Sequence, residues 1–350
     1  MLRGAKATLD RTTGALRSRI SKQARRELAL KDAEISALRR ELARLGGEEN
    51  LPASPIGGVP VFFLLGNQKS GTTWLMRMLD AHPEILCKGE GRFFGGSWRQ
   101  ESLKQRDTMR PASSLYNAVL DAEYLRLWIE RSVWSRNDIA NEHLDNLTRM
   151  AIDYFLGGEL LKSGKRVVGD KSPLLTPETI REISAIYPEA KVIHIIRDGR
   201  DVAVSAAHHA RNFGRASKRS ETEGSVFPEG QLEKLAAEWA SRVGKTVEDG
   251  PELLGENYTE VRYEDLLHKP EAEVHRLLVF LAVDSDEKAT TRCIEAASFE
   301  RLSKGRKRGE EDPSSFFRKG VAGDWKHVFT QGERETFDTE AGDLLAKLGY

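Results

Sequence analysis

The chain has 350 residues, enough for one large domain or two small ones, and its 39% hydrophobic and 31% charged residues suit a packed core with a solvated surface. Lys+Arg and Asp+Glu both number 54, so the zero net charge predicts no binding to nucleic acid. Two cysteines, Cys87 and Cys293, exclude a disulfide framework and a cysteine-rich zinc site. No apolar run approaches the roughly 18–20 residues of a transmembrane helix, and no apolar signal core is present, so we expect a cytoplasmic protein without a transmembrane segment.

Residues 1–47 are predicted to form a basic helical arm, because they hold 12 Lys/Arg against 5 Asp/Glu while the rest of the chain sums to −7. Within a helix expected at 15–45, apolar residues follow the a/d spacing of a short coiled coil for about two heptads: Leu28, Ile35, Leu38, Leu42 and Leu45. Residues 48–58, rich in Gly, Pro and Ser, are predicted to be a linker. The arm could self-associate, lie on a membrane surface through its basic residues, or remain a solvated helix.

From residue 59 onward, short apolar runs alternate with helical periodicity, which predicts one α/β domain over residues 59–350. The expected strands are Val61–Leu65, Arg166–Val168, Lys191–Ile196 and Tyr258–Tyr263, and the expected helices are 72–81, 177–187 and 199–211. Residues 101–160 are predicted to be a helical insertion and 211–230 a polar loop. The predicted fold is a three-layer P-loop-like α/β fold, with a central parallel sheet flanked by helices, preceded by the helical arm.

The first motif follows the first expected strand and opens a helix. Gly66-Asn67-Gln68-Lys69-Ser70-Gly71-Thr72-Thr73-Trp74 is a loop whose backbone N–H groups and helix N-terminus can surround an anion. Lys69 adds a point charge, and Ser70, Thr72 and Thr73 add hydroxyl donors. The nucleotide-triphosphatase loop has the same glycine spacing but places lysine where this chain has Thr72.

The second motif lies where the strand at 191–196 meets its helix. The strand ends in Arg197 rather than in a carboxylate that would bind magnesium, and Ser205 follows about two helical turns later. A guanidinium and a hydroxyl at a strand end suit a terminal phosphate. Without the other motifs, this segment would also fit a helix N-terminus capped by Asp198 with surface arginines.

These motifs resemble those of the sulfotransferases that use 3'-phosphoadenosine 5'-phosphosulfate (PAPS). Q-K-S-G-T-T-W at Gln68–Trp74 is similar to the family's 5'-phosphosulfate loop, and the segment from Arg197 to Ser205 is similar to its 3'-phosphate motif. R-K-G-V-A-G-D-W-K at Arg318–Lys326 is similar to its third motif. Two shorter segments, Y-E-D-L from Tyr263 and A-S-F at 297–299, resemble further parts of the nucleotide pocket. The motifs occur in the family order over residues 59–345.

The resemblance implies PAPS as co-substrate and no metal. It implies that Lys69 contacts the bridging oxygen and the sulfuryl group, and that the 5'-phosphate is held by Ser70, Gly71, Thr72 and Thr73. The 3'-phosphate would be held by Arg197, Ser205, Arg318, Lys319 and Gly320. Adenine would lie among Trp74, Tyr263, Ser298 and Phe299. Ala297 stands where the family has threonine, so one polar contact to the base is expected to be missing.

Sulfuryl transfer needs a group that deprotonates the acceptor and cations that stabilise the leaving bisphosphate. Many cytosolic members of the family use a histidine, but Lys171 stands at that place here. The segment around Glu90 resembles heparan and tyrosylprotein sulfotransferases, which implies Glu90 as general base, with Lys69 and Lys171 stabilising the transferred group. We expect Phe93, Phe94 and Trp98 to provide apolar surroundings for this carboxylate. His194 is interpreted as structural, and His208 or His209 could reach the acceptor.

Two other functions are compatible with parts of the sequence. A P-loop kinase or nucleotide phosphotransferase is the main alternative, and a scaffold with an inactive body is the second. The acceptor could be a carbohydrate, a phenol, a lipid alcohol or a peptide tyrosine. Lys326–Glu335 partly resembles the family's dimer segment, so a homodimer is a further expectation.

Overall fold

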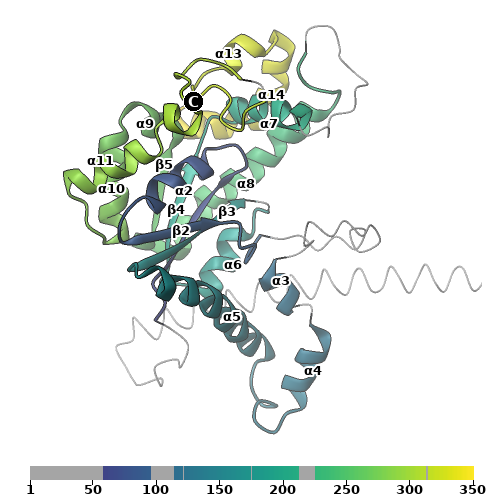
Figure 1. Ribbon diagram of the computed structural model, residues 1–350. Coiled ribbons are helices and arrows are strands. Elements are labelled where there is room, and N and C mark those ends of the chain that lie inside the picture. Colours follow the sequence, from purple (N-terminus) through teal and green to yellow (C-terminus); the bar gives the residue numbers. More distant parts are fainter. Residues whose placement is uncertain (1–57, 96–113, 121, 175, 213–224, 313) are drawn as a thin grey trace, which may run out of the picture.

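A computed structural model describes residues 58–95, 114–120, 122–174, 176–212, 225–312 and 314–350 (Figure 1). The predicted arm at 1–47, all but the last residue of the predicted linker, and most of the predicted polar loop at 211–230 lie outside these residues.

Five parallel strands form one sheet in the order β2-β3-β1-β4-β5. Their bounds are β1 (Val61–Asn67), β2 (Ile85–Gly89), β3 (Val167–Leu174), β4 (Lys191–Ile196) and β5 (Tyr258–Arg262). All four predicted strands are present, and β1 and β3 run beyond their predicted ends. The strand β2 was missing from the prediction because it is short and its last two residues are exposed, which leaves too small an apolar run to recognise.

Helices cover both faces of the sheet (Figure 1). They are α2 (Thr72–Asp80), α3 (Leu115–Leu120), α4 (Glu123–Arg131), α5 (Ala140–Ser163), α6 (Thr179–Ile186), α7 (Gly199–Asn212), α8 (Gln231–Leu254), η2 (Gly255–Asn257), α9 (Tyr263–His268), α10 (Pro270–Leu281), α11 (Glu287–Ala296), α12 (Phe299–Leu302), α13 (Trp325–Val328) and α14 (Gln331–Leu348). The predicted three-layer α/β fold with a central parallel sheet is therefore confirmed. The described part of the insertion is helical, as expected.

The central strand β1 is buried along its whole length, which explains its unbroken apolar sequence. Because side chains alternate along a strand, Phe62 and Leu64 pack on the face covered by α2 and α10, and Phe63 and Leu65 pack on the face covered by α5 and α6. A third core cluster joins Ile196 at the end of β4 to α7, α8 and α14. These three clusters hold the carboxyl ends of the strands in fixed positions.

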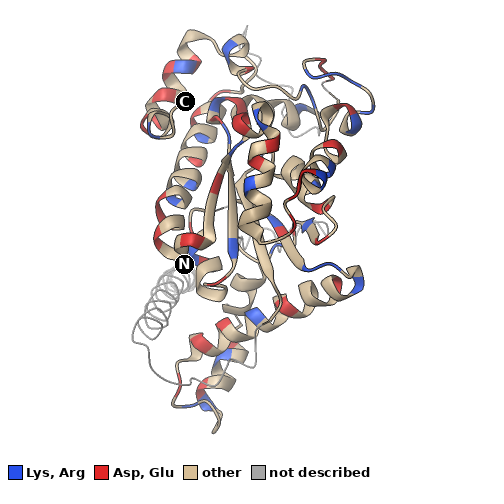
Figure 2. Ribbon diagram, turned by 90° about the vertical axis from the view of Figure 1, so that its left-hand side faces the viewer, with Lys and Arg blue, Asp and Glu red and all other residues tan. Residues whose placement is uncertain are grey.

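Charged residues are interspersed along the outer helices, and the strands are largely uncharged (Figure 2). Within the described part of the chain, no helix combines the length and the apolar character needed to cross a bilayer.

Candidate active site

One cavity of about 390 Å³ lies where the carboxyl ends of all five strands meet. Glu90 directly follows β2, Lys171 and Pro173 lie in the last half of β3, and Lys69 follows β1. Arg197 directly follows β4 and Tyr263 directly follows β5. Ligands of open parallel sheets bind at this edge. The cavity also includes these predicted site residues: Gly71, Thr72, Thr73, Trp74, Ser205, Phe299, Arg318, Lys319 and Gly320.

Backbone conformations that are unfavourable for residues with side chains gather at this cavity. Five described residues other than glycine have positive φ angles, and Lys69 (74°), Glu90 (53°) and Arg92 (54°) line the cavity. Such conformations cost about 1–3 kcal/mol each and persist where the surrounding structure requires them. Gly71 has φ 93°, and a Cβ atom there would lie 2.6 Å from Tyr263 Cδ2. The loop therefore needs glycine at this position.

The loop between β1 and α2 leaves polar groups without protein partners. The hydroxyl of Ser70 is fully buried and has no hydrogen-bond partner, and neither does the buried Nε of Arg197. Gly71 occupies the N-cap of α2 and has no side chain to satisfy the N–H groups of the first turn. Buried polar groups are nearly always paired, so these groups fit a site that is completed by an anion.

The three predicted catalytic residues lie together. Lys171 Nζ donates a hydrogen bond to Glu90 Oε1 at 2.7 Å, from a buried lysine to a carboxylate whose side chain is half exposed. Burial lowers the pKa of Lys69 to about 8, and the negative charge of Glu90 opposes this shift. The register of the sheet explains the pairing, because β2 and β3 align Gly89 with Lys171. A Cβ atom at Gly89 would lie 2.6 Å from Lys171 Cε, so glycine there leaves room for the lysine.

Two of the aromatic residues expected near Glu90 belong to a core cluster. Phe93 and Phe94 are buried in the core cluster beneath the sheet, and the ring of Phe94 packs edge-on against Phe63 at 5.4 Å between centroids. Trp98 lies outside the described residues. Lys171 donates to the carboxylate of Glu90, and the charge of Glu90 acts on Lys69.

His194, His208 and His209 occupy different positions relative to the cavity. His194 is fully buried on β4, its Nδ1 lies 2.8 Å from Tyr258 Oη, and burial lowers its pKa to about 3, which suits the expected structural role. His209 on α7 lines the cavity. His208 does not line it, and burial lowers the pKa of this imidazole.

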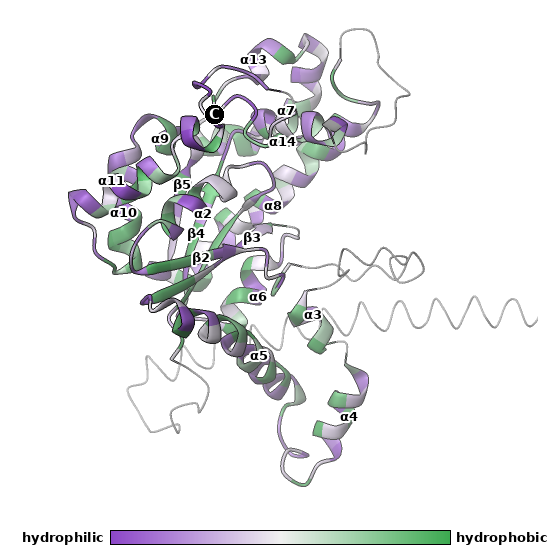
Figure 3. Cartoon of the chain, in the orientation of Figure 1, coloured by the Kyte–Doolittle hydropathy of each residue, from purple (hydrophilic) through white to green (hydrophobic). Residues whose placement is uncertain are grey.

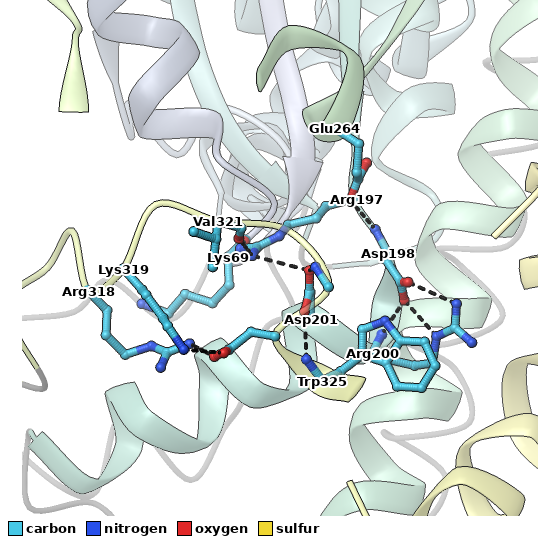
Figure 4. A network of polar contacts seen from close by, with 12 residues as sticks. Lys69, Arg197, Asp198, Arg200, Asp201, Glu264, Arg318, Lys319, Val321 and Trp325 are labelled. Carbon is cyan, nitrogen blue, oxygen red and sulfur yellow. Dashed lines mark hydrogen bonds and ion pairs between the residues drawn. The ribbon is translucent and has the colours of Figure 1, made fainter. Parts of the chain in front are cut away.

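Arg197 connects three parts of the site (Figure 4). Its guanidinium donates to the backbone oxygens of Lys69 at 3.2 Å and Val321 at 3.1 Å. It also stacks on the ring of Tyr263, 4.3 Å from the centroid. Ser205 lines the same cavity from α7. Arg197 thus contacts two segments at the same time. They are the phosphate loop, here defined as residues 66–74, and the third-motif segment, here defined as residues 318–325.

A buried carboxylate holds the third-motif segment against α7. Asp201, with 1% of its surface exposed, accepts hydrogen bonds from the backbone N–H groups of Gly323 at 2.7 Å and Trp325 at 3.0 Å (Figure 4). It also lies 3.6 Å from Arg197. Asp198 caps the first turn of α7 by accepting from the N–H of Arg200 at 2.9 Å. Asp198 therefore caps the helix, as the alternative interpretation of this segment predicted. The neighbouring Arg197 lines the cavity all the same.

Arg318 and Lys319 are paired with carboxylates in this structure. Arg318 forms an ion pair with Asp324 and donates to Glu311 at 2.6 Å, and Lys319 donates to Asp324 at 2.6 Å. Burial opposes the charge of Asp324, but hydrogen bonds from both cations outweigh it and hold the pKa of this carboxyl below its usual value. The two cations are thereby held at the cavity wall.

Aromatic rings also line the cavity. Trp74 and Tyr263 pack at 5.4 Å between centroids, and Phe299 lies beneath Gly320, where a Cβ atom would approach the ring to 2.4 Å. The indole N–H of Trp74 donates to the backbone oxygen of Ala297 at 2.8 Å. Ser298 does not line the cavity, and its hydroxyl caps α12 by accepting from the N–H of Arg301 at 3.4 Å. Ser70 is likewise absent from the cavity lining.

Several residues of the site were missed from the sequence. Arg308 and Phe316 line the cavity from a segment without a recognisable pattern, with Lys69 Nζ 5.4 Å from the Phe316 ring centroid. Asp201 could have been predicted from the sequence, because a carboxylate four residues after Arg197 at the start of a helix favours an i,i+4 ion pair. Among the described residues, no group of three or more His, Cys, Asp or Glu side chains could hold a metal ion.

A parallel sheet whose strand ends form an anion site beside aromatic rings defines the class of P-loop-like nucleotide-binding proteins. The chain belongs to the sulfotransferase family, whose model matches residues 60–287. It is 25% identical over 254 residues to protein-tyrosine sulfotransferase A of Caenorhabditis elegans, covering 69% of this chain and 57% of that protein. It is 30% identical over 203 residues to sulfotransferase 1B1 of Mus musculus, covering 52% and 62%. The first three curated relatives are matched over 57–66% of their own length. A mouse sulfotransferase crystallised with adenosine 3',5'-bisphosphate (PAP) aligns at a TM-score of 0.49 and 18% identity, covering 81% of this chain and 83% of that one.

Proposed function

We propose that this protein transfers the sulfuryl group of PAPS to a hydroxyl group of an acceptor by in-line displacement. The observation that carries the proposal is the ion pair between Lys171 and Glu90, which lies beside Lys69 of the phosphate loop. This arrangement places a carboxylate and two ammonium groups in one cavity, which is what deprotonation of an alcohol and stabilisation of a departing phosphate require.

The cavity offers a place for each part of the nucleotide. The first turn of α2, with Gly71, Thr72 and Thr73 in the cavity lining, would hold the 5'-phosphate. Arg197, Ser205 and the paired Arg318 and Lys319 would hold the 3'-phosphate. The rings of Trp74, Tyr263 and Phe299 would enclose adenine, because flat apolar surfaces stack on a base. Ser298 would act on this pocket through the start of α12 rather than by direct contact.

The proposed reaction assigns one role to each catalytic residue. Glu90 accepts the proton of the acceptor hydroxyl while the acceptor oxygen forms a bond to sulfur. The bond between sulfur and the bridging oxygen breaks, and Lys69 stabilises the charge that develops on the leaving 5'-phosphate. Lys171, which contacts Glu90 in this structure, stabilises the sulfuryl oxygens during transfer. The products are a sulfate ester and adenosine 3',5'-bisphosphate (PAP).

A binding experiment separates this function from that of a kinase. We expect PAP to bind the purified protein tightly in the presence of a chelator of divalent ions. A magnesium-dependent preference for ATP would contradict the proposal, and failure to bind any nucleotide would support a non-enzymatic scaffold. Titration calorimetry with PAP and ATP, each with and without magnesium, gives a distinct result for each function.

The acceptor is proposed only as a hydroxyl compound, which includes carbohydrates, phenols, lipid alcohols and peptide tyrosines. The matched relatives carry names that refer to different acceptors, protein tyrosine in one case and a 3β-hydroxysteroid in another. Transfer of radiolabelled sulfate from PAPS into fractionated cell extract, compared between the wild type and Glu90→Gln, would identify the class. The homodimer and the cytoplasmic location stay predictions from the sequence.

A further inference from the structure

The helix α5 carries an exposed apolar stripe on the side that faces away from the core. Leu144, Thr148 and Ile152 are buried against the body of the protein. On the opposite side of the helix, four large apolar residues are exposed, by 36%, 49%, 77% and 86% of their surfaces: Leu147, Met150, Tyr154 and Leu161. With α4, this helix extends away from the sheet, and hydrophobic and hydrophilic residues alternate around both helices (Figures 1 and 3). A contiguous exposed apolar stripe of this kind marks a binding surface.

The spacing of the stripe is that of a coiled-coil seam. Leu147, Met150, Tyr154 and Leu161 occupy positions a, d, a and a of successive heptads, and the remaining d position is Gly157. A seam of this width is narrower than the apolar face of a core helix and suits one partner helix. At a rise of 1.5 Å per residue it is about 21 Å long.

The chain itself contains a segment with the matching pattern. The predicted helix at 15–45 has apolar residues at a/d spacing from Leu28 to Leu45, a length of about 26 Å if helical. The segment 28–45 has four basic residues against three acidic ones, whereas α5 has four acidic residues against two basic ones. The apolar pattern favours contact between the two segments, and their small net charges are of opposite sign.

The chain connectivity places the arm beside this helix. Val59 packs against α5, where a Cβ atom at Gly157 would lie 3.0 Å from Val59 Cγ2, and Pro60, the residue before β1, accepts from the N–H of Val168. The N-terminal segment therefore leaves the described fold at the d position of the stripe itself. The 13 residues from 46 to 58 can span about 40 Å when extended, which is more than the length of the stripe.

We infer that the N-terminal arm of this chain docks on α5, with Leu28 to Leu45 packed along the stripe from Leu147 to Leu161. The arm then covers apolar side chains that the rest of the described fold leaves exposed. This inference does not depend on the catalytic function, because α5 residues are absent from the lining of the cavity.

Hydrogen–deuterium exchange on the full-length protein tests the inference. We expect the amides of residues 28–45 to exchange at least about tenfold more slowly than an unstructured chain, independently of protein concentration. The double variant Met150→Lys/Tyr154→Lys places two charges in the seam and should remove this protection, because docking would bury both cations among apolar side chains. The control Val279→Lys, at a similarly exposed apolar residue on α10, should leave the protection unchanged.

Three results would overturn the inference. Exchange of residues 28–45 at the unprotected rate in the wild type would show that the arm does not dock. Protection that survives Met150→Lys/Tyr154→Lys would place the arm elsewhere. Protection that rises with protein concentration would show pairing between arms of two copies. Exchange in β1 and β4 serves as the internal check that the double variant is folded, because both substituted side chains are exposed.

Discussion

At the scale of single residues, the site concentrates unfavourable backbone and electrostatic states. Lys69, Glu90 and Arg92 adopt left-handed backbone conformations, Lys171 is a buried cation, and Lys69 is a partly buried one. The strained conformations persist because the surrounding structure is rigid: two core clusters hold β1, β3 and β4 in place. The consequence is a set of charges that is already in place before a ligand binds.

Replacing Glu90 by Gln should remove turnover and leave nucleotide binding intact. An amide of the same shape cannot accept the acceptor proton, so we expect a loss of about 10²–10⁴-fold in kcat, as for other removed general bases. Radiolabelled sulfate transfer measures the rate, and calorimetry with PAP measures the affinity. Glu159→Gln, which changes an exposed carboxylate paired with Lys88 outside the cavity, is the matched control. Turnover of Glu90→Gln close to that of the control would contradict the assignment.

The affinity for PAP should fall as the pH rises above about 8. Burial lowers the pKa of Lys69 to about 8, so this lysine is charged below that pH and neutral above it in the free protein. Bound phosphate favours the charged form, so binding above pH 8 takes up a proton and weakens by up to about tenfold per pH unit. Calorimetry in buffers of different ionisation enthalpy measures the uptake. Lys69→Arg keeps its charge and should show no such decline, and an equal decline in this variant would assign the effect to another group.

At the scale of elements, Asp201 couples the helix α7 to the third-motif segment at residues 318–325. Its carboxylate accepts from the N–H groups of Gly323 and Trp325 and lies beside Arg197. Arg200, one residue earlier, stacks on the ring of Trp325 at 3.8 Å. The first turn of α7 therefore holds the third-motif segment at Gly323 and Trp325, and none of its residues lines the cavity.

Asp201→Asn should weaken binding of PAP by about 10–100-fold, since hydrogen bonds to a charged group contribute about 1.5–3 kcal/mol. The amide can accept with one oxygen only and presents N–H groups toward another N–H donor. We expect faster hydrogen exchange in residues 318–325 and little change elsewhere. Asp343→Asn, at an exposed carboxylate on α14, is the control. Unchanged PAP affinity in Asp201→Asn would show that the segment is held by its other contacts.

At the scale of the whole molecule, β1 unites the two main cores. Its alternate side chains enter different clusters, so a single strand anchors the helices on both faces. The phosphate loop follows directly from this strand, which makes the geometry of the site depend on the packing of the entire sheet.

Phe63→Ala should lower the free energy of unfolding by about 3–5 kcal/mol, because the ring is fully buried and its removal leaves a cavity. Its neighbours Phe94 and Tyr187, at 5.4 and 5.5 Å between ring centroids, come from other elements and cannot easily close the space. Urea unfolding followed by circular dichroism measures the change. Val279→Ala, at a half-exposed residue of α10, should change stability by less than about 0.5 kcal/mol. Equal shifts in the two variants would show that β1 is not central to stability.

The sequence by itself determined the strands with long apolar runs, the anion loop and the family motifs. β1 and β4 are recognisable because burial on both faces requires continuous apolar residues, and the loop because close backbone approach requires glycine at Gly66 and Gly71. These are local requirements, so they are visible in the residues that meet them.

Only the tertiary structure decided which charges meet. Glu90 lies beside Lys171 because β2 pairs with β3 in a register that aligns Gly89 with the lysine, and β2 is too short to be recognised from its composition. Asp201 meets Gly323 and Trp325 across more than 120 residues of chain, at separations of 122 and 124. Strand order and register follow from the packing of the whole sheet, and local sequence patterns do not contain that information. The phosphate loop was therefore predictable as a motif, whereas the Lys171–Glu90 pair beside it was a result of the fold.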